Sequence, residues 1–201
     1  MYSTHARNTM LDAIGVTHAS LHTAYSAVGA NEVAGGAPAY ARKAATFNAA
    51  AGGAKTSSNA PIFDVPAAAT IRFIGFWDAV AAGNFKGMVA NGASSGTGIG
   101  EFEFWIDVVA NTVEHAAHGL LDGDKIVFYN GAAPGGLVEG TVYFVVNKTV
   151  DDFQVAATLA GAAIDLVSQA ADSVVCAKIV EETFGAQGTH TVTSSSLGLN
   201  N

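Results

Sequence analysis

The chain has 201 residues, among them 39 alanines and 23 glycines, and only 13% of the residues are charged. A hydrophobic fraction of 50% with so few charges excludes a wholly disordered chain, because disordered chains combine low hydrophobicity with high charge. The formal net charge is −8 and no basic cluster extends beyond Arg42-Lys43, which argues against a nucleic-acid-binding surface.

The sequence also gives no sign of a membrane or secreted protein. Its apolar stretches are too short for a membrane span, and its first residues lack the basic-then-apolar order of a secretory signal. Cys176 is the single cysteine, so an internal disulfide is impossible. We therefore expect synthesis in a reducing cytoplasm and no membrane partner.

The first predicted element is a short helix. Ser3 or Thr4 can cap a helix over residues 6–14, and Gly15 can end it. Met10 belongs to the apolar face of this helix. Almost everything that follows has the period-two alternation or the short apolar runs of β-strands.

The remainder of the first half predicts antiparallel strands. Alternation suggests a half-buried strand over residues 21–26, and a glycine turn between residues 40–48 and 55–60 suggests a hairpin. Residues 71–78 form the strongest strand pattern and pair with residues 85–90 across a second glycine turn. This half is predicted to be an antiparallel β-sandwich with a small leading helix.

Residues 91–100 have the composition of a linker, and the pattern of apolar residues changes after them. Short strand patterns then recur about every ten residues, a spacing typical of a small all-β barrel or sandwich. They cover parts of residues 102–113 and then residues 125–129, 141–147, 153–156, 164–167 and 174–179.

The last part of the chain returns to the polar, glycine-punctuated style of the first half, with one more strand predicted in residues 189–199. We therefore expect a mainly β protein with a host β-sandwich domain formed by residues 1–100. An inserted β domain of residues 101–180 interrupts it, and residues 181–201 complete it.

We interpret the histidines and aspartates near residue 118 as structural residues and not as metal ligands. His115 and His118 have H-x-x-H spacing, but such a pair converges on a metal best from a helix, and this segment has the pattern of a strand followed by a turn. We interpret His118 as a turn cap. Asp122 and Asp124 lack the remaining ladder of a calcium loop and are predicted to form a turn.

Motifs for catalysis are equally weak. The glycine-rich residues 94–100 lack the lysine of a phosphate-binding loop, and no G-x-S-x-G nucleophile motif is present. Cys176 lies among valines and is expected to be a buried, unreactive thiol. Carboxylate pairs are scattered and none is singled out for glycan hydrolysis. We assign no catalytic residue, cofactor or metal, and predict that the protein is not an enzyme.

Four aromatic residues are candidate contact residues. Alternation places Trp77 and Trp105 opposite their phenylalanine neighbours and so suggests outward-facing rings. On a surface with few charges, such rings indicate contacts between copies of the chain. We therefore expect a homo-oligomer, and we expect its symmetry to be three-fold. Trp105, Tyr129 and Tyr143 are alternatively candidates for stacking on sugar rings.

Residues 32–55 (EVAGGAPAYARKAATFNAAAGGAK) and 74–79 (IGFWDA) resemble a family of tailed-bacteriophage virion proteins, of the minor tail or tail-fibre type. Members run in the order E-V-G-G-Y-A-R, a glycine-alanine hairpin, F-G-I-F-D-A and a threonine-rich final strand. Residues 183–193 and 197–200 match that closing element. The chain departs from the motif at residues 36–40, where Gly-Ala-Pro-Ala-Tyr replaces Gly-Tyr.

A second stretch is similar to a β-rich module found in phage tail, fibre and other virion proteins. Five spaced elements of that module occur in order within residues 117–155: His-Gly-Leu, Gly-Asp, Gly-Leu, Gly-Thr-x-Tyr and Phe-Gln-Val. Together the two resemblances imply a structural role in the virion after synthesis in the host bacterial cytoplasm.

The function that these resemblances imply is that of a minor tail or tail-fibre subunit, which binds copies of itself and other tail or capsid proteins. One alternative is a capsid decoration protein on the phage head. A second alternative, from a different class, is a carbohydrate-binding module for the host surface, carried by the inserted domain.

Overall fold

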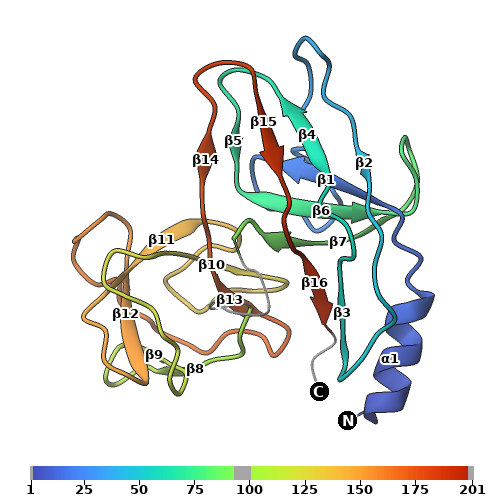
Figure 1. Ribbon diagram of the computed structural model, residues 1–201. Helices are drawn as coiled ribbons and strands as arrows, with labels where there is room; N and C mark the ends of the chain where they lie inside the picture. The colour runs from blue at the N-terminus through green and yellow to red at the C-terminus, as the bar shows by residue number, and fades with distance from the viewer. Residues whose placement is uncertain (1, 93–100, 199–201) are drawn as a thin grey trace. The chain divides into compact units, whose positions relative to one another are not determined.

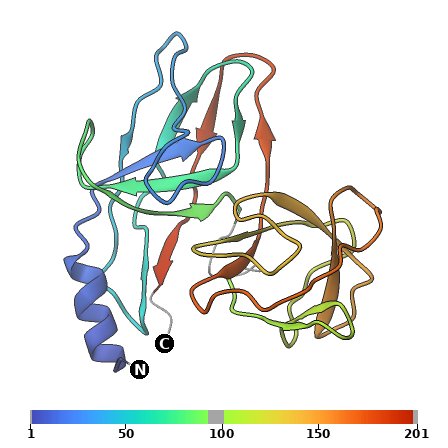
Figure 2. The same ribbon diagram turned by 180° about the vertical axis from the view of Figure 1, so that it is seen from behind.

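The computed structural model describes residues 2–92 and 101–198. The fold is mainly β with one short N-terminal helix, as predicted, and its sheets are antiparallel (Figures 1 and 2). The chain divides into two compact units: unit 1, Met1–Ser95 with Glu181–Asn201, and unit 2, Gly96–Val180. No helix in the described ranges is long and apolar enough to cross a membrane.

Helix α1 (Thr4–Ala13) begins two residues earlier and ends one residue earlier than the predicted range of residues 6–14. The Ser3 side chain accepts a hydrogen bond from a backbone N–H of the first turn, and Gly15, at φ +72°, follows the helix. Leu11 is buried, but Met10 is 36% exposed. Helix α1 packs beside β3 (Ala54–Thr56), and this contact leaves Met10 partly accessible to water.

Within the described residues, unit 1 has seven strands before residue 101 and three after residue 180. The first seven are β1 (His18–His22), β2 (Lys43–Ala44), β3, β4 (Ile62–Val65), β5 (Thr70–Ile71), β6 (Phe73–Trp77) and β7 (Phe85–Ala90). Four of them form an antiparallel sheet in the order β2-β1-β6-β7. All five residues of β6 are buried, which explains why this strand has an apolar run rather than alternation.

The segment after the insertion completes unit 1 strand by strand. It contributes β14 (Glu182–Thr183), β15 (Gly188–Thr191) and β16 (Ser196–Gly198), which pair with β5, β4 and β3 respectively. Figure 1 shows these red strands beside the cyan strands of the first half. The single closing strand expected in residues 189–199 is thus two strands, β15 and β16.

The core of unit 1 collects side chains from the four-stranded sheet and from the strand pairs beside it. Its buried apolar residues include Leu21, Phe63, Val65, Ile71, Ile74, Phe76, Val89 and Val192. Residues 85–90 form β7 as predicted, and residues 71–78 form β5 and β6.

The strand expected over residues 21–26 is wrong beyond His22. Strand β1 ends there because the Ser26 hydroxyl accepts hydrogen bonds from the N–H groups of Val28 and Ala30 and so closes a loop.

Unit 2 contains one six-stranded sheet in the order β13-β10-β11-β12-β9-β8. A single antiparallel bridge joins Phe102, just before β8, to Cys176 of β13 at the other edge. The strands are β8 (Trp105–Asp107), β9 (Thr112–Glu114), β10 (Lys125–Tyr129), β11 (Val142–Val146), β12 (Asp152–Ala156) and β13 (Val175–Lys178). Cys176 is fully buried in the core of this unit, as predicted.

One predicted strand of unit 2 does not form. Residues 164–167 are irregular, because the Asn111 side chain hydrogen-bonds both the Leu166 N–H, at 2.7 Å, and the Ile164 carbonyl, at 3.1 Å. The Ile164 N–H donates to the Val155 carbonyl of β12 and the Val167 N–H donates to the Gly135 carbonyl, so backbone and side-chain partners alternate and no regular strand forms. Of the predicted linker, residues 93–100 lie outside the described residues.

Deleting residues 101–180 and joining Gly100 to Glu181 is expected to leave unit 1 folded. The reason is that β14, β15 and β16 pair only with strands of unit 1 in the described chain. The shortened chain should keep the β-type circular dichroism and unfold cooperatively on heating. Loss of the β signal would contradict independent folding.

Candidate functional site

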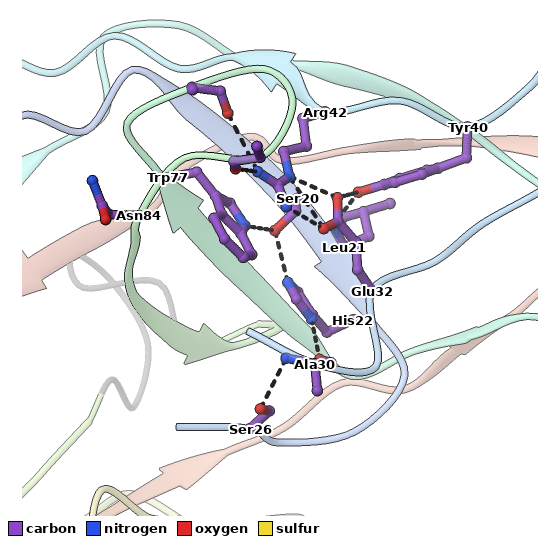
Figure 3. A network of polar contacts seen from close by, with 12 residues as sticks. Ser20, Leu21, His22, Ser26, Ala30, Glu32, Tyr40, Arg42, Trp77 and Asn84 are labelled. Carbon is purple, nitrogen blue, oxygen red and sulfur yellow. Dashed lines mark hydrogen bonds and ion pairs between the residues drawn. The ribbon is translucent and has the colours of Figure 1, made fainter. Parts of the chain in front are cut away.

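The residues that carry the phage-protein resemblance meet in one polar network of unit 1 (Figure 3). Glu32 and Arg42 belong to the first motif of that resemblance, residues 32–55. They form an ion pair in which the Arg42 Nη2 donates to the Glu32 Oε2 at 2.7 Å. The Arg42 Nε donates to both carboxylate oxygens, at 3.0 and 3.1 Å. The two side chains are only 11% and 22% exposed, so the pair is largely shielded from water.

The second motif of the fibre-type resemblance, residues 74–79, and the turn after it surround the same guanidinium. The Arg42 Cζ lies 3.4 Å from the centre of a Trp77 ring, a cation–π contact. The Arg42 Nη1 donates to the carbonyl of Ala82 at 2.7 Å and to that of Ala79 at 3.4 Å. All three nitrogens of Arg42 therefore have partners, and they connect residues 32–42 to the turn after β6.

Tyr40 extends the network toward β1. Its hydroxyl accepts a hydrogen bond from the Leu21 N–H at 2.8 Å and donates to the Glu32 Oε1 at 3.4 Å. Burial raises the pKa of Tyr40 above its ordinary value, so the hydroxyl keeps the proton that it donates. The ring stacks on Phe63 of β4, which links the network to the apolar core.

A buried chain of hydrogen bonds runs from Trp77 into β1. The Trp77 indole N–H donates to the Ser20 Oγ at 2.8 Å, and this oxygen lies 2.7 Å from the His22 Nε2. The His22 Nδ1 lies 2.8 Å from the Ala30 carbonyl and must therefore carry a proton. It follows that Nε2 of the neutral ring accepts the Ser20 hydroxyl proton.

Gly75 makes room for this chain. A Cβ at that position would lie 2.4 Å from the His22 Nε2 and 2.5 Å from the Ser20 Oγ, so no other residue fits without displacing the network. The glycine of the second motif thus has a packing reason. Burial also lowers the pKa of His22, which favours the neutral ring.

The aspartate of the second motif organises the β6–β7 hairpin. Hydrogen bonds from the side chain and the backbone N–H of Asn84, at 2.7 and 2.6 Å, lower the pKa of Asp78 to about 2. Lys86 adds an ion pair at 3.2 Å. This carboxylate is therefore charged at neutral pH and closes the loop that supplies the Ala82 carbonyl to Arg42.

The residues at the departure from the family motif are also fixed. The Gln187 side chain accepts a hydrogen bond from the Ala37 N–H and donates to the Pro38 carbonyl, both at 3.2 Å. The altered turn is thus held by the segment that completes unit 1 after the insertion.

The network stabilises the fold and offers no reaction centre. Ser20 and His22 have the hydrogen bond of a nucleophile and its base, but both are fully buried and the Ser20 oxygen already accepts the Trp77 N–H. A substrate has no route to that oxygen. No group of three or more metal-ligating side chains occurs within residues 2–92 and 101–198.

The structure separates the four aromatic contact candidates. Trp77 is 8% exposed, Tyr143 6% and Tyr129 0%, because each hydroxyl or indole N–H has an internal partner and each ring lies in a core. The Tyr129 hydroxyl donates to Glu101, and that of Tyr143 accepts from Val138 N at 2.9 Å. These three rings cannot stack on a partner or a sugar, whereas Trp105 is 62% exposed on β8.

The histidines and aspartates that the sequence singles out in unit 2 hydrogen-bond the backbone of turns and loops. The His118 Nδ1 accepts the Leu120 N–H at 3.0 Å, which makes His118 the turn cap that the sequence predicts. Asp124 accepts the Leu121 N–H at 2.9 Å, and Asp122 accepts the Lys148 N–H at 3.0 Å. His115 lies elsewhere, 2.7 Å from the Glu103 carbonyl.

Sequence reasoning missed Ser20 and His22, because strand alternation gives no sign of a buried polar pair. The sequence identifies Glu32, Tyr40 and Arg42 as residues of the first motif but does not indicate that they contact one another. The contact between Arg42 and Trp77 is not visible in the sequence, because the two residues lie 35 positions apart. The signal that points to them is the co-occurrence of the two motifs in one chain.

The network should make unit 1 sensitive to acid. His22 is neutral in the folded state and its folded pKa lies below the unfolded value of about 6.5, so the unfolded chain binds the proton first. The free energy of unfolding should therefore be constant above about pH 6.5 and fall as the pH drops below it. Urea unfolding between pH 7.5 and 5, at about half-unit steps, should show that this component disappears in His22→Gln. The same slope in both proteins would contradict the assignment.

The comparisons with known proteins agree with the motifs. The family described as podophage GP4 fiber I protein gp80 matches residues 2–102. No curated protein and no solved structure matches the chain. Because the match covers half of the sequence and contains the whole Glu32–Arg42–Trp77 network, the chain belongs to the podophage GP4 fiber I protein gp80 family.

Proposed function

We propose that the chain is a non-enzymatic structural subunit of the minor tail or tail-fibre type, which acts in the virion by binding copies of itself and other tail proteins. The observation that carries this proposal is the match to a phage fibre family over residues 2–102. That match includes α1, the four-stranded sheet and the polar network, which together form most of unit 1.

The construction of unit 1 supports a role in assembly. Its motif residues are used to hold the chain's own strands together, and the Ser20–His22 pair is closed to substrates. A subunit that must keep its shape under load benefits from buried, fully partnered polar groups, since they fix one arrangement of the strands.

Helix α1 is the surface that we assign to contacts with a neighbouring subunit. Leu11 is its one fully buried residue among those described, while Tyr2, just before it, and Met10 are 65% and 36% exposed. Both views show α1 extending away from the four-stranded sheet of unit 1 (Figures 1 and 2). Exposed apolar groups of this kind are typical of contact sites, and a trimer is the assembly that we propose for them.

In the capsid decoration alternative, the chain also acts by binding other virion proteins, but on the head of the phage. The carbohydrate-binding alternative keeps only Trp105 of its three rings, because Tyr129 and Tyr143 are buried. The assembly role on the tail is therefore the function that we propose first.

Labelling of intact virions separates these functions. Gold-labelled antibody raised against the full chain should bind the tail in negative-stain images, because a fibre-type subunit is exposed there. Virions that lack the gene product are the control for antibody specificity. Label on the head would contradict the tail role and favour decoration, and unlabelled virions would contradict both.

A further inference from the structure

A groove at one end of the unit 2 sheet has the features of a small-ligand site. It encloses about 310 Å³, within the range of about 300–1,000 Å³ that is common for such sites. Its walls come from the turn before β10, the end of β11 and the loop after β12. The lining residues are Asp122, Gly123, Val145, Val146, Asn147, Leu159, Ala160 and Gly161.

Two oxygens of the lining residues remain available as acceptors. Asp122 uses Oδ1 for the Lys148 N–H, and Asn147 uses its amide nitrogen to donate to the Gln154 Oε1 at 2.7 Å. Within the described residues, the second carboxylate oxygen of Asp122 and the amide oxygen of Asn147 make no hydrogen bond. Two acceptors of this kind suit a ligand with more than one hydroxyl donor.

The rest of the groove is aliphatic. Leu159 is 65% exposed and, at 3.1 Å, its Cδ1 would touch a Cβ placed on Gly123, so its side chain stands against the turn before β10. Val145 and Val146, the last two residues of β11, are buried and also line the groove. An apolar wall beside paired acceptors fits a molecule with C–H groups on one face and hydroxyls at its edge.

Charge narrows the ligand further. Asp122 is the one ionisable residue that lines the groove. Because a carboxylate repels anions, uronic acids and phosphates are disfavoured. The groove backbone is also already shaped, with Asn147 and Ala160 in the left-handed region at φ +52° and +53°.

We propose that this groove binds a neutral sugar residue, with Asp122 and Asn147 accepting hydrogen bonds from neighbouring hydroxyls and Leu159 packing on the C–H face of the ring. The groove lies outside residues 2–102, so this binding goes beyond the fibre-subunit role and does not depend on it. It is also distinct from Trp105, which does not line the groove.

The test is NMR titration of the ¹⁵N-labelled full chain with free D-galactose, D-glucose, D-mannose and N-acetyl-D-glucosamine, with D-glucuronate and inorganic phosphate as charged probes. At least one neutral sugar, added to about 50 mM because single sugars bind weakly, should shift the amide signals of Gly123, Asn147 and Gly161. The charged probes should leave these signals in place.

Two variants connect the shifts to the groove. Leu159→Glu places a charge on the aliphatic wall and should weaken binding at least tenfold (~1.4 kcal/mol). Val167→Glu is the matched control, since Val167 is also 65% exposed but does not line the groove, and it should bind like the wild type. Asn147→Gly, which keeps the left-handed backbone, should also weaken binding.

The proposal is overturned if no neutral sugar shifts the three amides, if a charged probe shifts them instead, or if Leu159→Glu binds as well as Val167→Glu. These outcomes leave the fibre-subunit role untouched, because that role is measured by the position of the chain in the virion.

Discussion

Burying a guanidinium is costly unless its nitrogens find acceptors, and this requirement organises unit 1 around Arg42. Glu32 supplies the opposite charge, the turn after β6 supplies two carbonyls, and the Trp77 ring covers the remaining face. These groups come from two separate segments of the chain: the loop that contains Glu32, and the end of β6 with the turn after it. Satisfying one buried charge therefore fixes how a loop, a strand and a hairpin turn lie against each other.

The same constraint explains the family motifs. Trp77 holds Arg42 with its ring and Ser20 with its N–H, so the ion pair and the Ser20–His22 chain belong to one network. Gly75 is small because that chain needs the space, and Asp78 shapes the turn whose carbonyls Arg42 uses. The motif residues therefore preserve one arrangement of the strands of unit 1.

The sequence predicted the elements better than the network. Capping by Ser3, the β6–β7 hairpin and the burial of Cys176 follow local rules, and they appear as expected. Trp77 failed as a surface residue because alternation indicates which side of a strand a ring takes, but not whether another layer covers that side. The irregular residues 164–167 are bound by an amide side chain at position 111, and the groove in unit 2 is formed by the turn before β10, the end of β11 and the loop after β12. Such contacts become visible only when the chain is folded.

The most direct test of the account is a double-mutant cycle on Glu32→Gln and Arg42→Met, measured as free energies of unfolding in urea. A Trp105→Phe background leaves Trp77 as the single tryptophan, so its fluorescence reports on unit 1. The account predicts a coupling energy of about 2 kcal/mol or more for this shielded pair. The more exposed pair Lys43–Asp64, whose side chains are 34% and 29% exposed and whose charged atoms lie 3.3 Å apart, is the control and should give less than about 1 kcal/mol. A Glu32–Arg42 coupling no larger than that of the control would contradict the account.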